Sequence, residues 1–332
     1  MNNFKKLGLT ALAGSLASVS AYAAEMTVSG ATVLTYTSED PTEVTGNPYG
    51  MKTNLGFTAS GEVNGYTVSY MQTSVDQFAG MSSARLSVDM GDMGLIAFDQ
   101  GSGSGLATID DKTPTAAEEI WDGLDGLTAG GLVGAAGNSG VWNYVHSFGG
   151  VKFNGAFRKG SGTKNADGAS SGAADNAGQG AWDFALTTDG SMLGVDGLAI
   201  GAGYGEAARD TTGAVDDEHM TAFANYSVGP VSFGVQMSTI EAGTVGTAQE
   251  NTEAWGLAFN VNDDLSISYG ERDVEFDGAG VNATVTEQGD GIAVAYTMGS
   301  IKIAGNRNTV DNNGGTTGSS DEMTEIAVSF AF

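Results

Sequence analysis

The chain has 332 residues with no cysteine, 52 glycines and only four prolines, and 40 acidic against 13 basic residues give it a net charge of −27. The absence of cysteine excludes disulfides and thiolate metal sites, and the acidity argues against nucleic acid as a partner. After the first 23 residues no segment reaches 18 consecutive apolar residues, which excludes a transmembrane helix. This composition favours strands joined by tight turns.

The N-terminus has the pattern of a secretory signal peptide. Lys5 and Lys6 precede an apolar stretch over 7–19, and Ala21-Tyr22-Ala23 is a small-x-small cleavage site. We expect residues 1–23 to be removed and residues 24–332 to form the mature barrel, with 11 basic and 40 acidic residues and a net charge of −29. The alternative, a membrane anchor, requires about 30 Å of apolar helix, whereas this stretch would span about 20 Å.

From residue 24 onward, segments of about ten residues alternate apolar and polar side chains, as half-buried strands do. The connections between them are alternately short and long, which is typical of bacterial outer-membrane barrels. We therefore predict an all-β fold, a 16-stranded antiparallel transmembrane β-barrel. The expected strands are 26–37, 52–63, one beginning at Tyr66, 83–90, 95–100, 141–148, 151–159, 181–188, 198–207, 219–228, 231–239, 252–261, 265–275, 291–298, 301–310 and 322–332.

The last strand has two distinct faces. Ile326, Val328, Phe330 and Phe332 alternate with smaller or polar residues, and the chain stops on the last of these rings. In a barrel, one face of such a strand meets lipid, the other meets the lumen, and the strand pairs with the first one to close the ring. We expect Phe330 and Phe332 to serve barrel closure and assembly.

The longest irregular stretch, 101–140, is the third long loop and is rich in acids. We expect its acidic side chains to face basic side chains on the wall at a pore constriction, since charged rings set ion preference in channels. Alternation places the wall bases inside, because a base on the lipid face would cost about 2–4 kcal/mol. We expect a modest cation preference. The candidate residues are Arg85, Lys152, Arg158, Arg272 and Lys302 on the wall and Asp110, Asp111, Glu118 and Glu119 on the loop.

Other chemistry has weak support in the sequence. Asp122 and Asp125 are candidates for a structural calcium site because calcium prefers oxygen ligands, although their spacing fits no known calcium loop. The only histidines, His146 and His219, lack the spacing of metal ligands. We expect neither an enzyme nor an organic cofactor.

Four short stretches follow one another along the chain: Glu25-Met-Thr-Val-Ser-Gly30, 85–103, Val141-Trp-Asn-Tyr-Val145 and Ser329-Phe-Ala-Phe332. In this order they resemble the general porins of Gram-negative outer membranes, in particular the small alphaproteobacterial kind. The resemblance implies a homotrimer whose third loop narrows a passive diffusion pore for small hydrophilic solutes. It also implies an outer-membrane location, with lipid, lipopolysaccharide and the barrel-insertion machinery as partners.

The sequence departs from this family in two places. Arg85 is the only arginine in its part of the wall, where enteric relatives have a denser basic cluster, and the third loop lacks a Pro-Glu-Phe-Gly-Gly-type sequence. Two alternative functions therefore stay open. One is a substrate-specific channel of the same shape, and the other is a secreted soluble β-protein such as an adhesin or a carbohydrate-binding module.

Overall fold

The computed structural model describes the chain in nine stretches, and the predicted signal peptide, 1–23, lies outside them. The described residues are 25–39, 46–75, 81–124, 131–137, 139–160, 180–209, 215–243, 246–278 and 284–332. None of the helices in these stretches has the length and hydrophobicity needed to cross a membrane.

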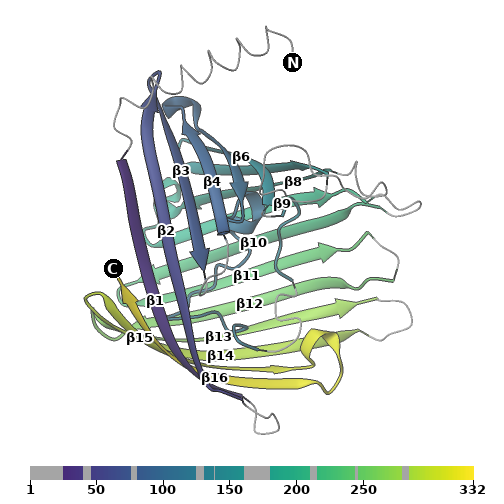
Figure 1. Ribbon diagram of the computed structural model, residues 1–332. Helices are drawn as coiled ribbons and strands as arrows, with labels where there is room; N and C mark the ends of the chain where they lie inside the picture. The colour runs from purple at the N-terminus through teal and green to yellow at the C-terminus, as the bar shows by residue number, and fades with distance from the viewer. Residues whose placement is uncertain are drawn as a thin grey trace, which may run out of the picture.

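The structure confirms the predicted 16-stranded antiparallel barrel (Figure 1). Each strand pairs with its neighbours in sequence, and β16 pairs with β1 to close the ring. The strands are β1 (Glu25–Glu39), β2 (Tyr49–Val63), β3 (Tyr66–Val75), β4 (Met81–Asp89), β5 (Leu95–Gln100), β6 (Ser139–Phe148), β7 (Val151–Lys159), β8 (Gly180–Asp189), β9 (Leu198–Ala207), β10 (Asp217–Val228), β11 (Val231–Glu241), β12 (Gln249–Asn260), β13 (Leu265–Asp277), β14 (Val285–Met298), β15 (Ile301–Asp311) and β16 (Ser320–Ala331).

Short 3₁₀ helices interrupt four of the connections. They are η1 (Gly91–Met93), η2 (Gly105–Thr108), η3 (Gly190–Leu193) and η4 (Asn313–Gly315). Of these, η2 matters most for the interior, because it lies in the long connection between β5 and β6.

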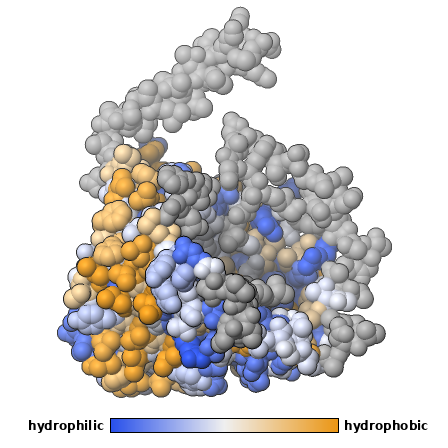
Figure 2. Space-filling view, turned by 60° about the horizontal axis from the view of Figure 1, so that its bottom comes forward, coloured by the Kyte–Doolittle hydropathy of each residue, from blue (hydrophilic) through white to orange (hydrophobic). Residues whose placement is uncertain are grey.

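Alternation along the strands separates an apolar outer face from a polar inner face. On β6, Trp142 faces outward and is 53% exposed, whereas the next residue, Asn143, faces the interior and is 1% exposed. Figure 2 shows hydrophobic residues over the left of the molecule and hydrophilic residues in its hollowed centre. Exposed large side chains on one continuous face mark an interaction with lipid or another chain. This distribution argues against the secreted soluble β-protein.

The C-terminal residue takes part in closing the barrel. The backbone N–H of Phe332 donates to the carbonyl of Gly30, and the N–H of Gly30 donates back, both at 2.9 Å. Gly30 leaves room for the terminal ring, since a Cβ there would lie 2.7 Å from Phe332 Cε2. The first and last strands are thus joined by backbone pairing and by a ring that covers a glycine.

The largest difference from the expected strands is at β14, which begins at Val285 rather than at residue 291. The added residues are polar on both faces: Glu287 points inward and is 3% exposed, while Asp290 points outward and accepts a hydrogen bond from Thr309. An apolar–polar alternation cannot mark a strand end of this kind, which explains why the sequence placed it in a loop.

Candidate functional site

The connection between β5 and β6 lies against the inner face of the barrel. We call its described part, 101–124 and 131–137, the inserted segment. Its backbone groups are bound by inward-facing polar side chains from strands around more than half of the ring. These wall residues are Asn154 on β7, Asp183 on β8, Asn225 on β10, Gln236 on β11, Ser268 on β13 and Asn308 on β15.

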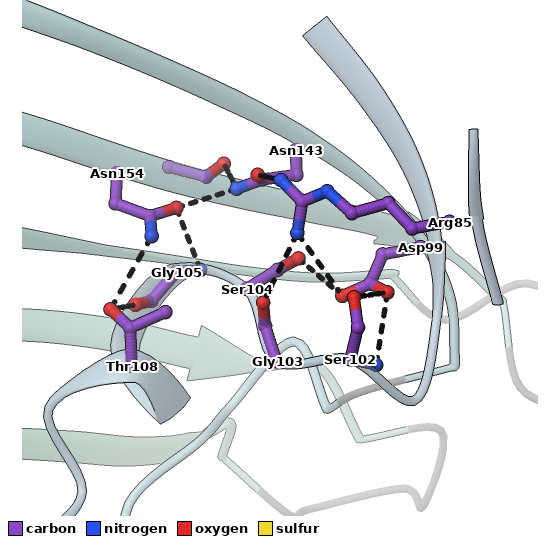
Figure 3. A network of polar contacts seen from close by, with 10 residues as sticks. Arg85, Asp99, Ser102, Gly103, Ser104, Gly105, Thr108, Asn143 and Asn154 are labelled. Atoms are coloured by element: carbon purple, nitrogen blue, oxygen red, sulfur yellow. Dashed lines mark hydrogen bonds and ion pairs between the residues drawn. The ribbon is translucent and has the colours of Figure 1, made fainter. Parts of the chain in front are cut away.

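The inserted segment begins in a network of buried polar groups (Figure 3). The Asp99 carboxylate, fully buried at the end of β5, accepts hydrogen bonds from Ser102 and, at 2.6 Å, from the hydroxyl of Ser104. Arg85 lies 3.8 Å from the same carboxylate and donates to Gly103 O and to Asn143. A buried carboxylate requires such partners, so this end of the segment has a fixed conformation.

The same network continues into η2. Asn143 donates to Asn154 Oδ1 at 2.5 Å, and that oxygen also accepts the Gly105 N–H at 3.0 Å. The amide nitrogen of Asn154 lies 3.4 Å from the Thr108 hydroxyl. Side chains of β6 and β7 thereby bind the first turn of the segment.

Asp183 holds the two limbs of the inserted segment together. Its Oδ1 accepts the N–H of Leu106 at 3.0 Å, and its Oδ2 accepts the N–H of Ala136 at 2.8 Å. Leu106 and Ala136 are both fully buried. One carboxylate on β8 therefore binds residues at the beginning and the end of the segment.

The middle of the segment binds to Gln236 and to Asn308. Gln236 donates to Ile109 O and Asp110 O and accepts the Lys112 N–H. Farther on, Asn308 donates to Glu119 O at 3.1 Å and to Asp122 O at 2.8 Å. These amides hold the backbone of the segment against the wall.

Glycines on the inner wall give the segment its close fit. A Cβ on Gly256 would lie 2.7 Å from Pro114 O, and a Cβ on Gly291 would lie 2.9 Å from Ile120 Cγ2. Gly234 and Gly270 contact the same two segment residues. A larger side chain at these positions would overlap the segment, so the wall glycines determine how closely it approaches.

Between the inserted segment and the opposite wall lies a cavity of about 530 Å³. Glu118 and Asp122 line it from the segment, and Lys52, Lys302 and Glu325 line it from the wall. One line of cross-strand pairs connects the two lysines, because Lys52 pairs with Val33, Val33 with Ser329 and Ser329 with Lys302. Three carboxylates thus share the cavity with two ammonium groups.

Burial affects the acids of the segment. It raises the pKa of the Asp122 carboxyl above its ordinary 3.8, and the nearby Lys52 ammonium offsets part of that rise. Burial also raises the pKa of Glu119 above 4.5, and the neighbouring carboxylates of Asp111, Glu118 and Asp122 raise it further. The pKa of Asp110 is raised for the same first reason. These groups take up protons at higher pH than exposed carboxyls do.

The predicted wall bases fall into different surroundings. Lys302 lines the cavity, whereas Arg85 and Arg272 are in contact with Asp99 and Glu287. Arg272 is only 5% exposed. The remaining two predicted wall bases are on β7. Arg158 lies beside Gly137 of the segment, and Lys152 is exposed near the Gly149-Gly150 turn.

The predicted loop acids also differ. Glu118 lines the cavity, whereas Asp111 accepts hydrogen bonds from Thr113 and from the indole of Trp121. Asp110 accepts the N–H of Asp111, and Glu119 is half-buried. The role of Asp110, Asp111 and Glu119 in a constriction stays a prediction.

Sequence reasoning missed two charged residues of the cavity. Lys52 shares the inward face of β2 with Asn54, and Glu325 shares that of β16 with Ala327. The alternation that placed Lys302 inside applies equally to both, so the signal was present.

Of the calcium candidates, Asp122 lies in the cavity and Asp125 lies outside the described residues. Within the described stretches no group of three or more potential ligands is placed to hold a metal ion, and calcium binding stays a prediction.

No protein-family model and no curated protein matches the sequence. Among solved structures, OmpT of Vibrio cholerae is similar with a TM-score of 0.66 and 13% identity over 93% of this chain and 98% of that one. OmpF of Salmonella typhi in complex with daunomycin has a TM-score of 0.65 and 12% identity over 93% and 98% of the two chains. Another porin structure has a TM-score of 0.63 and 14% identity over 93% of this chain and 100% of that one.

These likenesses extend over nearly the whole barrel. The chain therefore has the fold of the outer-membrane porins.

Proposed function

We propose that the protein is an outer-membrane porin, a passive channel for small hydrophilic solutes and ions rather than an enzyme. The observation that carries this proposal is the cavity between the inserted segment and the wall, lined by charged side chains within a closed barrel that is apolar outside. Strands can cross a membrane only when their backbone groups are paired in a closed ring. A charged, water-filled interior then provides the path for solutes.

We infer that the pore is mildly cation-selective. The carboxylates of Glu118, Asp122 and Glu325 outnumber the ammonium groups of Lys52 and Lys302 around the cavity. The mature charge of −29 would also concentrate cations near the mouth over a Debye length of about 8 Å at physiological salt. Both effects attract cations, and salt screens both.

The finer assignments rest on the sequence motifs. We assign the protein to the general, alphaproteobacterial type of porin, located in the outer membrane among lipid and lipopolysaccharide, and assembled by the barrel-insertion machinery. A homotrimer is the oligomer we propose, and a trimer form is described for the similar OmpT of Vibrio cholerae. The broad apolar outer face offers surface for contact between copies.

Planar-bilayer recording of the purified full chain tests the proposal. The wild type should conduct and prefer potassium over chloride in a KCl gradient. The double change Glu118→Gln and Asp122→Asn leaves two lysines against one carboxylate, so the reversal potential should move to zero or past it.

A matched control removes two carboxylates from the outer face. Glu253 and Asp273 are directly opposed on β12 and β13 and face away from the lumen, and changing them to Gln and Asn should leave the reversal potential as in the wild type. A silent bilayer would refute the channel, and an unchanged reversal potential in the lumenal variant would refute the proposed constriction. Saturation of the current by one solute would favour the substrate-specific channel.

A further inference from the structure

Arg272 on β13 is a cation that is buried among carboxylates on the inner wall. It is only 5% exposed, and its guanidinium Nη1 lies 3.6 Å from the carboxylate of Glu287 on β14, which is 3% exposed. Two further carboxylates interact electrostatically with the same guanidinium, those of Asp111 on the inserted segment and Glu250 on β12. One buried positive charge therefore balances carboxylates on three different parts of the chain.

Two of these carboxylates hold the inserted segment. Glu250 accepts the backbone N–H of Gly131. That glycine begins 131–137, which leads back to β6 and which we call the return limb. Asp111 accepts the indole N–H of Trp121 at 3.1 Å, and both of these residues lie in the part that leads away from β5. The base that balances these charges therefore acts on both parts of the segment.

The return limb lies directly against the buried base. A Cβ on Gly131 would lie 3.3 Å from Arg272 Nη2 and would overlap Thr252 Oγ1. The φ angle of Gly131 is also positive, at 73°, which favours glycine. No larger side chain fits between the limb and the base at this point.

The third carboxylate holds the loop between β15 and β16. Glu287 accepts the backbone N–H of Gly314 in η4 at 2.7 Å. The next residue, Gly315, lies on the ring of Phe276 on β13, since a Cβ there would be 2.9 Å from Phe276 Cγ. The loop therefore rests on β13 and β14, the two strands that carry the buried ion pair.

We propose that Arg272 is a positioning residue whose charge holds the return limb and the loop between β15 and β16 on the same part of the wall. Without this charge, the carboxylates of Asp111, Glu250 and Glu287 are unbalanced and repel one another, so both pieces of chain separate from the wall together. The loop thereby helps to set the position of the inserted segment. The proposal rests on the channel proposed above, because this position affects function only where solutes pass.

Hydrogen exchange of the purified full chain, followed by mass spectrometry, tests this role. At pH 7, Arg272→Met should lower the protection of 131–137 and of 312–319 about tenfold, because removing one partner of a buried ion pair leaves uncompensated charge. Arg272→Lys should keep both protected, since a 3.6 Å contact with one carboxylate oxygen does not require a bidentate group. Arg307→Met is the matched control and should change neither, because Arg307 pairs with Glu322 at 2.7 Å on the outer face.

Acidification separates an effect of charge from an effect of shape. At about pH 4, close to the ordinary pKa of carboxyl groups, carboxylates that repel one another take up protons. The protection in Arg272→Met should then recover to that of the wild type at the same pH. Gly131→Ala overlaps Thr252 but keeps every charge, so it should release the return limb alone, and acid should not restore it.

Three results would overturn the proposal. They are wild-type protection in Arg272→Met at pH 7, a loss of protection in that variant that acid does not restore, and a loss confined to 131–137. If Arg272→Met does not assemble, the triple variant Arg272→Met, Glu250→Gln and Glu287→Gln removes two of the unbalanced charges together with the base. This variant should assemble, and its failure to do so would also overturn the role of charge.

Conductance distinguishes this proposal from the channel itself, because exchange is measured whether or not the protein conducts. A protein that is silent in a bilayer but shows the expected exchange pattern would refute the channel and support the role of Arg272. A conducting protein without this pattern would refute the role of Arg272 alone.

Discussion

At the scale of the residue, the inner wall separates charges that hold the inserted segment from charges that face the cavity. Arg85 is in contact with the buried Asp99 carboxylate and the Gly103 carbonyl, so its charge is largely compensated. Lys52 and Lys302 instead share a cavity with acids. A selectivity argument that counts all inward bases equally therefore overestimates the positive charge along the solute path.

The raised pKa values of Asp122 and Glu119 predict a pH-dependent selectivity. Burial raises both pKa values, so Asp122 takes up its proton above the ordinary 3.8 of aspartate and Glu119 above the ordinary 4.5 of glutamate. The cation preference should therefore decrease as the pH falls from 8 to 5, and reversal potentials in a KCl gradient would show it. Stability changes with pH in the opposite direction to cation preference. Protonation removes the cost of burying the charged carboxylates, so binding of the inserted segment to the wall is favoured at low pH and disfavoured as the pH rises.

Asp122→Asn provides the comparison for this prediction. It should have a smaller cation preference at pH 8 and a smaller change on acidification than the wild type. A cation preference that is constant down to pH 4 in the wild type would contradict the assignment of these acids to the solute path.

At the scale of the element, the inserted segment and the wall fit because side chains are missing from the wall. Pro114 and Ile120 of the segment approach the inward glycines of β11 to β14 within contact distances that a Cβ would violate. Inward amides of Gln236 and Asn308 then bind the backbone of the segment. The wall glycines thus determine how closely the inserted segment approaches the wall, and the amides determine the orientation of its backbone.

Replacing one of these glycines should displace the tip of the segment. A Cβ on Gly291 would lie 2.9 Å from Ile120 Cγ2 and 2.5 Å from Asn308 Oδ1, so Gly291→Val should push Ile120 into the cavity at a cost of about 1–3 kcal/mol. Single-channel conductance should fall and the open-channel noise should rise. Gly305→Val, on the outer face of β15, is the control, and equal conductance in the two variants would count against this fit.

The sequence indicates strands well and their partners poorly, for a physical reason. Alternation says which face a residue is on, so it located the strands and placed Lys302 inside. It does not say which inward groups are neighbours, so it could not distinguish Arg272, which contacts Glu287 on the adjacent strand, from Lys302, which lines a cavity. The role of the wall glycines could not be predicted, because a glycine shows in the sequence only that a side chain is missing and not which residue packs into the space.

At the scale of the whole molecule, closure depends on the pairing of β1 with β16. Two backbone hydrogen bonds join Gly30 and Phe332, and the terminal ring covers Gly30. An open edge strand in hydrocarbon would leave unpaired backbone groups, each costing several kcal/mol. Phe332 therefore contributes to the stability of the closed barrel through both its backbone and its ring.

Deleting Phe332 should prevent assembly. In SDS without boiling, the wild type should run far above the monomer and move to the monomer position on boiling, as a heat-stable oligomer does. The deletion should lack the upper band and be degraded by added protease, because the final strand loses both bonds to Gly30. Phe332→Tyr, which keeps the backbone and an aromatic ring, should assemble. A deletion variant with the normal upper band would show that closure does not need this residue.

The placement of the inserted segment also has a consequence for the order of assembly. The segment follows β5, yet its hydrogen-bond partners extend along the chain from Asn154 to Asn308. The contacts with Asn308 can form only after β15 has joined the sheet, and contacts between distant parts of a chain form slowly. The width of the aperture is therefore a late product of folding. A chain that stalls before its last strands can bind the beginning of the segment through Asn154 and Asp183 but lacks Asn308, so the barrel must be nearly complete before the whole segment is fixed.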